Sequence, residues 1–173
     1  MLPQRKEIRL KEYDYNTSGY YFITICTKEK AKILCDVVGD GVYDIPNIQL
    51  SKLGEIADKY IKKLNGQYSN VSIDKYVIMP NHIHLIIKIT EFFDGEKILF
   101  GTSQAPYPTS ATNAIIPKFV SLYKRYCNRE CNANIFQRSF YDHVIRGEQD
   151  YKEIWEYIEE NPAKWQEDKF YIE

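Results

Sequence analysis

The stretch Tyr76-Val77-Ile78-Met79-Pro80-Asn81-His82-Ile83-His84-Leu85-Ile86-Ile87-Lys88-Ile89 decides the fold. Residues 71–79 and 82–89 are rich in β-branched and aromatic side chains and meet at the Pro-Asn pair, which predicts an antiparallel hairpin. Residues two apart in a strand share a face, so His82 and His84 should point the same way. The opposite face carries an unbroken apolar row that can be buried: Ile83, Leu85, Ile87 and Ile89.

The imidazole face of this hairpin has two interpretations. The chain contains only three histidines, and neutral imidazole is the commonest side-chain metal ligand, so two of them on one strand face indicate a metal site. The alternative is a pair of surface histidines that bind nothing. The two-residue spacing, taken alone, favours that alternative.

Other segments predict an alternation of strands and helices around the hairpin. Residues 20–27 and 140–145 have the composition of strands, whereas apolar residues recur at helical spacing in three further segments. These predicted helices are residues 51–64, with Ser51 as N-cap and Gly66 just past the end, residues 117–127, which begin near Pro117, and residues 148–160, which end before Pro162. The order predicts an α+β, ferredoxin-like fold, in which helices pack on an antiparallel sheet and the C-terminal helix carries a tyrosine, Tyr157.

The whole chain predicts one globular domain over residues 1–173. Hydrophobic residues make up 44% and charged residues 27%, which is an ordinary globular composition. Residues 92–113 are rich in Gly, Pro, Ser and Thr, which predicts a mobile loop inserted in that domain. The absence of a leader-like or membrane-spanning apolar run, together with four cysteines that lack a two-residue-gap pair, predicts a cytoplasmic protein that does not enter a membrane.

Charge is nearly balanced overall but unevenly distributed. The net charge is −1, yet residues 116–146 carry six cations against two acids, whereas residues 148–173 carry nine acids against three lysines. The basic stretch permits phosphate binding, and two ordinary solvated faces explain the same pattern equally well.

The last predicted helix adds polar groups at a regular spacing. Glu153, Tyr157 and Asn161 are four residues apart and therefore recur along one face. The Asn161 carbonyl with two imidazole nitrogens makes a mixed N/O ligand set that suits Mg²⁺ or Mn²⁺. The Tyr157 phenol, with a pKa of about 10, becomes a nucleophile once its proton is removed. Each residue also has a purely structural interpretation, Tyr157 as a packing tyrosine and Asn161 as a helix C-cap before proline.

Three motifs resemble one known family. They are Tyr76-Val77-Ile78-Met79-Pro80-Asn81-His82-Ile83-His84, Phe136-Gln137-Arg138-Ser139-Phe140-Tyr141-Asp142-His143-Val144-Ile145-Arg146 and Tyr157-Ile158-Glu159-Glu160-Asn161-Pro162. Together they resemble the REP-associated tyrosine transposases, which belong to the single-tyrosine transposases within the HUH nucleases. The likeness starts at residues 9–15 and covers nearly the whole chain, with only residues 28–47 and 92–113 matching loosely. Phe136 stands where family members often carry Trp, a change that leaves the chemistry untouched.

The resemblance implies a chemistry and a partner. It implies that His82, His84 and Asn161 hold Mg²⁺ or Mn²⁺, and that Tyr157 cleaves single-stranded DNA at hairpin-forming repeats through a covalent 5′-phosphotyrosine intermediate. Phosphate contacts are then expected from the basic stretch: Lys118, Lys124, Arg125, Arg138 and Arg146. The alternative is a non-catalytic nucleic-acid binding module on the same fold. The sequence is compatible with a monomer or a homodimer, and the short linker 146–149 favours a site built from one chain.

Overall fold

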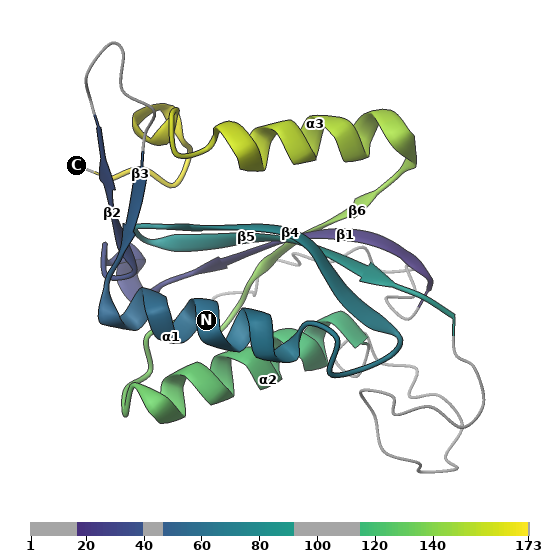
Figure 1. Ribbon diagram of the computed structural model, residues 1–173, viewed down its shortest axis with the longest axis horizontal. Helices are drawn as coiled ribbons and strands as arrows, with labels where there is room; N and C mark the ends of the chain where they lie inside the picture. The colour runs from purple at the N-terminus through teal and green to yellow at the C-terminus, as the bar shows by residue number, and fades with distance from the viewer. Residues whose placement is uncertain (1–16, 40–46, 92–114, 173) are drawn as a thin grey trace, which may run out of the picture.

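The computed structural model describes residues 17–39, 47–91 and 115–172, and Figure 1 shows their arrangement. The predicted loop at 92–113 and the motif at 9–15 lie outside the described residues. The helices and strands are, in chain order, β1 (Gly19–Cys26), β2 (Cys35–Val38), β3 (Asn47–Leu50), α1 (Lys52–Leu64), β4 (Val71–Met79), β5 (His82–Ile89), α2 (Ile115–Glu130), β6 (Tyr141–Ile145) and α3 (Gly147–Glu160). Short 3-10 turns follow β1 and α3, at Lys28–Lys30 and Trp165–Glu167.

The main sheet is antiparallel, with the strand order β4-β5-β1-β6. Its four strands alternate with α1 and α2 in the way that the sequence predicts, so the ferredoxin-like α+β fold is confirmed. The predicted hairpin forms, with Met79 paired to His82 across the tight turn. On the other side of β5, the register pairs Thr24 with His84, which places a hydroxyl beside the second imidazole.

The two faces of the sheet bury different helices (Figure 1). The larger core holds Ile83, Leu85 and Ile87 of β5 together with apolar side chains of α1 and α2. The smaller core lies on the opposite face, where Met79 and Ile86 pack with Ile158 of α3. Because His82 and His84 share their strand face with Ile86, the histidines lie under α3.

Helix α1 begins and ends where its capping residues predict. The Ser51 hydroxyl accepts a hydrogen bond from the Gly54 N–H at 3.1 Å, and Gly66 takes a φ of +76° just beyond the end. Gly54 is required for a different reason, since a Cβ built at that position would stand 1.9 Å from the Leu34 carbonyl oxygen. The first turn of α1 therefore packs directly on backbone.

Two features differ from the sequence-based expectation. Helix α2 is longer than residues 117–127 at both ends. Pro117 does not mark its start, because a proline in the first turn lacks only an N–H that has no partner within the helix. The two-stranded β2–β3 sheet was not predicted, since its strands are only four residues long and partly exposed. Within the described parts of the chain, none of the helices combines the length and the apolar character that a bilayer span requires.

Candidate metal and tyrosine site

The two histidines of β5 are fully buried between the sheet and the C-terminal segments. Both His82 and His84 are 0% exposed, and their ring centroids are 4.4 Å apart. The His84 Nδ1 lies 2.9 Å from the Thr24 hydroxyl, and the Phe170 ring packs 4.7 Å from the His82 ring. The interpretation of these residues as ligand-free surface histidines is therefore wrong, since neither is at the surface.

The hairpin turn determines the tautomer of His82. The Asn81 side-chain amide donates to the Phe170 carbonyl at 2.8 Å, which orients the Asn81 Oδ1 toward the His82 Nδ1 at 2.9 Å. An amide oxygen only accepts hydrogen bonds, so the His82 Nδ1 must carry the proton. The lone pair of the ring is then on Nε2, and this buried atom has no hydrogen-bond partner among the described residues. A metal-binding imidazole has the same arrangement.

Helix α3 and the turn after it bring the tyrosine to the histidines. The Tyr157 hydroxyl lies 3.3 Å from the His84 Nε2 and donates a 2.7 Å hydrogen bond to the Asp168 Oδ2. The Asn161 side-chain nitrogen donates to the same carboxylate oxygen at 2.7 Å. The Phe170 backbone N–H donates to the other oxygen, Oδ1, at 2.6 Å, so Asp168 is held from both sides.

Burial and hydrogen bonding set the charge states of the site. Burial lowers the pKa of His82 to about 4 against the opposing charge of Asp168, and burial also holds the pKa of His84 well below its ordinary value. Burial and then the hydrogen bond to Asp168 raise the pKa of Tyr157. Burial alone would raise the pKa of Asp168, but hydrogen bonds from Tyr157, the Phe170 N–H and Asn161 outweigh it and lower this pKa. At neutral pH the site therefore holds two neutral imidazoles, one carboxylate and one phenol.

The side chains of this site form a possible metal-binding cluster. One ligand atom each from His82, His84 and Asp168 lies within 4.8 Å of the others, and Asp168 was missed by the sequence interpretation. The Asn161 Oδ1 is a second buried acceptor without a partner among the described residues. Two imidazole nitrogens with carboxylate and amide oxygens make a possible site for a divalent cation. The chain around Asp168 has no periodic pattern by which this ligand could have been found.

An acidic hollow opens beside the tyrosine. Its volume is about 310 Å³, and it is lined by Glu153, Glu156, Tyr157, Glu160, Asn161, Lys164, Glu167 and Asp168. The predicted shared face of Glu153, Tyr157 and Asn161 is confirmed, since all three line this hollow. Glu153 accepts a hydrogen bond from Gln149 at 2.8 Å and is absent from the ligand cluster.

His143, the remaining histidine, lies in β6 and contacts the first turn of α3. The His143 Nε2 lies 2.9 Å from the Asp150 Oδ2, and this carboxylate also accepts the Arg146 backbone N–H at 2.7 Å. Asp150 thereby caps the first turn of the helix that carries the tyrosine. His143 is exposed and lies outside the ligand cluster.

The five cations predicted to contact phosphate have different environments. Arg125, Arg138 and Arg146 are exposed, and Lys118 is partly buried. Lys124 is only 9% exposed, and its ammonium donates to the carbonyls of Gln137 and Ser139 at 2.8 Å each. The expected phosphate contact of Lys124 therefore does not fit this environment, because the 137–139 segment folds over its side chain and its carbonyls bind the ammonium.

Comparisons with known proteins agree with this fold. No protein-family model matches the chain. An uncharacterised protein of Haemophilus influenzae is 33% identical over 175 residues, which cover 98% of this chain and 94% of that protein. A second protein of that organism, provisionally named a REP-associated tyrosine transposase, is 25% identical over 87% of this chain and 74% of its own length. A solved structure of a REP-associated tyrosine transposase bound to a REP hairpin superimposes with a TM-score of 0.58 at 19% identity, over 91% of this chain and 74% of that one.

These relatives and the α+β sheet with its tyrosine helix define a transposase-like protein. The chain resembles the REP-associated tyrosine transposases in its three motifs, in its 25% identity to the relative provisionally given that name, and in its fold. Its uncharacterised Haemophilus influenzae relative matches it over almost its whole length.

Proposed function

We propose that the protein is a metal-dependent endonuclease and transesterase that acts on single-stranded DNA with Tyr157 as its nucleophile. The observation that carries the proposal is the position of the Tyr157 hydroxyl, 2.7 Å from a carboxylate oxygen of Asp168 and 3.3 Å from the His84 Nε2. The substrate class comes from the family, since the solved relative is bound to a REP hairpin. Hairpin-forming DNA repeats are therefore the proposed substrate.

The proposed metal ligands are His82, His84, Asn161 and Asp168. When bound there, Mg²⁺ or Mn²⁺ supplies positive charge that stabilises a phenolate and polarises phosphate oxygens. The low pKa values of the histidines keep both imidazoles neutral and able to donate lone pairs near pH 7. Asn81 holds His82 in the tautomer that directs a lone pair into the site.

The chain's own residues prepare the nucleophile. The Tyr157 proton already points at Asp168, which can accept it as the phenol oxygen attacks phosphorus. The bond from the Tyr157 oxygen to phosphorus forms, and the bond from phosphorus to the 3′-oxygen breaks. The 3′-oxygen takes up a proton and leaves as a hydroxyl, while the downstream strand stays attached as a 5′-phosphotyrosine. A second 3′-hydroxyl can reverse the step without ATP, because the link is still a phosphodiester.

The test uses hairpin oligonucleotides labelled at either end. We expect wild-type protein with Mn²⁺ or Mg²⁺ to form an adduct that resists denaturation, only with the 3′-labelled strand, and Tyr157→Phe to form none. Tyr151→Phe is the matched control, because it removes a hydroxyl from the same helix that bonds Asp74 instead of Asp168.

Two outcomes would count against the proposal. Full cleavage by Tyr157→Phe would exclude this tyrosine as the nucleophile. Tight hairpin binding without cleavage across a broad hairpin library would support the non-catalytic binding module.

A further inference from the structure

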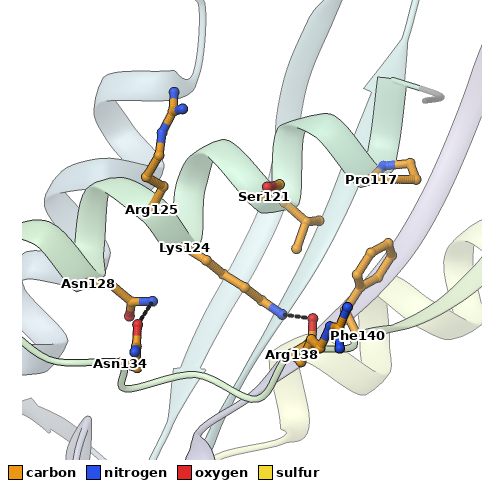
Figure 2. A pocket seen from close by; sticks show the side chains of 9 residues that line it. Pro117, Ser121, Lys124, Arg125, Asn128, Asn134, Arg138 and Phe140 are labelled. Atoms are coloured by element: carbon orange, nitrogen blue, oxygen red, sulfur yellow. Dashed lines mark hydrogen bonds between the residues drawn. The ribbon is translucent and has the colours of Figure 1, made fainter. Parts of the chain in front are cut away.

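A second hollow lies on the α2 side of the molecule, away from the tyrosine. Its volume is about 490 Å³, within the range of small-ligand pockets, and none of its described lining residues is acidic. Arg125 and Arg138 supply charge, and neither forms an ion pair with the described residues. The lining residues are Pro117, Val120, Ser121, Lys124, Arg125, Asn128, Asn134, Arg138 and Phe140 (Figure 2).

The wall of this hollow is tied to α2 at two points. Figure 2 shows the Lys124 side chain crossing from the helix to the segment that carries Arg138, with Phe140 beside it. Its ammonium donates to the carbonyls of Gln137 and Ser139, while at the other end the Asn128 Oδ1 accepts the backbone N–H of Ile135 at 3.1 Å. The hollow is therefore preformed, and ordering it on binding costs little.

The sheet edge connects this hollow to the candidate catalytic site. Phe140 lines the hollow, whereas the next residue, Tyr141, pairs with Thr24 and points to the histidine face. Tyr141 is 49% exposed, and its ring lies 5.8 Å from Phe170, which packs against His82. Two consecutive aromatic residues thus point to opposite sides of the sheet edge at the start of β6.

The distribution of charge favours a DNA strand that approaches the histidines across the β6 edge. The hollow beside Tyr157 carries five carboxylates, which repel phosphates. On the side of Phe170, by contrast, the ammonium groups of Lys30 and Lys169 lie 5.6 Å and 5.1 Å from the ring centroid. A phosphate backbone therefore meets cations if it reaches the histidines from the β6 edge.

We propose that the hollow between α2 and residues 134–140 holds an unpaired nucleotide of the DNA strand whose backbone crosses the β6 edge to reach Tyr157. The apolar floor of Pro117, Val120 and Phe140 receives the base, and the Asn128 and Asn134 amides offer polar contacts to its edge. Arg125 extends from α2 away from Arg138, so the two guanidinium groups contact different phosphates (Figure 2). This inference rests on the proposed function, because that function names single-stranded DNA as the ligand.

The test measures binding of a fluorescent single-stranded hairpin with an unpaired flank to full-length protein carrying Tyr157→Phe, over a range of salt concentrations. Arg125→Gln and Arg138→Gln should each weaken binding and reduce the slope of log K against log salt by about 0.7, the contribution of one single-strand phosphate. Arg129→Gln is the matched control, since it removes the same charge one turn along α2. Arg125 and Arg129 both lie over the Tyr126 ring, but Arg129 does not line the hollow. The control variant should leave the slope unchanged. Phe140→Leu, which keeps an apolar side chain, should weaken binding without changing the slope.

The outcomes separate this inference from the proposed function. Equal slopes for Arg125→Gln, Arg138→Gln and Arg129→Gln would overturn the inference, even if wild-type protein forms the tyrosine adduct. Binding of free deoxynucleotide or inorganic phosphate as tight as that of the strand would also overturn it, in favour of a small-anion pocket. Absence of any adduct from wild-type protein would instead overturn the proposed function, while reduced slopes would still support a nucleotide in the hollow.

Discussion

Asn81 offers a sharp test of the metal site, because it controls the lone pair of His82 from outside the ligand set. The residue is 0% exposed and makes two buried hydrogen bonds, to the Phe170 carbonyl at 2.8 Å and from the His82 Nδ1 at 2.9 Å. Asn81→Ala leaves both partners unsatisfied at roughly 1–3 kcal/mol each, so we expect the free energy of unfolding to fall by about 2–6 kcal/mol. Loss of the group that orients a ligand histidine should lower Mn²⁺ affinity by roughly 10–100-fold.

Asn81→Asp separates the effect on the metal from the effect on stability. The carboxylate still accepts the His82 Nδ1 proton but faces the Phe170 carbonyl oxygen without a donor. We therefore expect lower stability with Mn²⁺ affinity at or above the wild-type value. Calorimetric Mn²⁺ titration measures affinity, and urea denaturation measures stability. Wild-type Mn²⁺ affinity in Asn81→Ala, or equal affinity losses in both variants, would refute the reasoning.

Three further predictions follow from single contacts. Asp168→Asn keeps the shape of the side chain but removes the carboxylate that accepts the tyrosine proton. The single-turnover rate of adduct formation should therefore fall by about 10²–10⁴-fold. A wild-type rate in this variant would contradict the role of Asp168. Burial lowers the pKa of His82 to about 4, so between pH 6.5 and 4 the unfolded chain binds more protons than the folded one. In EDTA, the free energy of unfolding should therefore decrease by up to about 3 kcal/mol as pH falls through this window, and His82→Gln should lose that part of the slope in urea titrations. Gly54→Ala places a Cβ 1.9 Å from the Leu34 carbonyl oxygen and should lower the free energy of unfolding, measured with urea, by about 3 kcal/mol or more. Gly66→Ala has open space around its Cβ but a φ of +76°, so it should lower this free energy by about 1 kcal/mol. Equal losses would show that the backbone moves to relieve the clash at residue 54.

Local patterns carried much of the information about the site. Alternation along β5 placed His82 and His84 on one face, and the four-residue spacing placed Tyr157 and Asn161 on one face of α3. Both inferences depend on the period of a single element, which a sequence displays directly. The order of elements was sufficient for the ferredoxin-like sheet, because antiparallel strands joined by helices have few ways to pair.

Contacts between distant segments were not predictable in the same way. Asp168 enters the site because the turn after α3 folds back onto the hairpin, where the Phe170 carbonyl meets Asn81. Lys124 was expected to contact phosphate, but carbonyls from the segment before β6 bind its ammonium. Neither contact produces a periodic pattern in the sequence, because each depends on the position that a loop takes in the folded chain.

The amino-acid sequence by itself thus determined the resemblance to the REP-associated tyrosine transposases, the sheet and the two faces that carry the imidazoles and the phenol. These properties follow from local periodicity and motif order. Only the tertiary structure decided which groups surround the tyrosine, which nitrogen of His82 carries its proton and which cation is buried. Those properties depend on through-space distance and exclusion of water, which arise when segments far apart in the chain pack together.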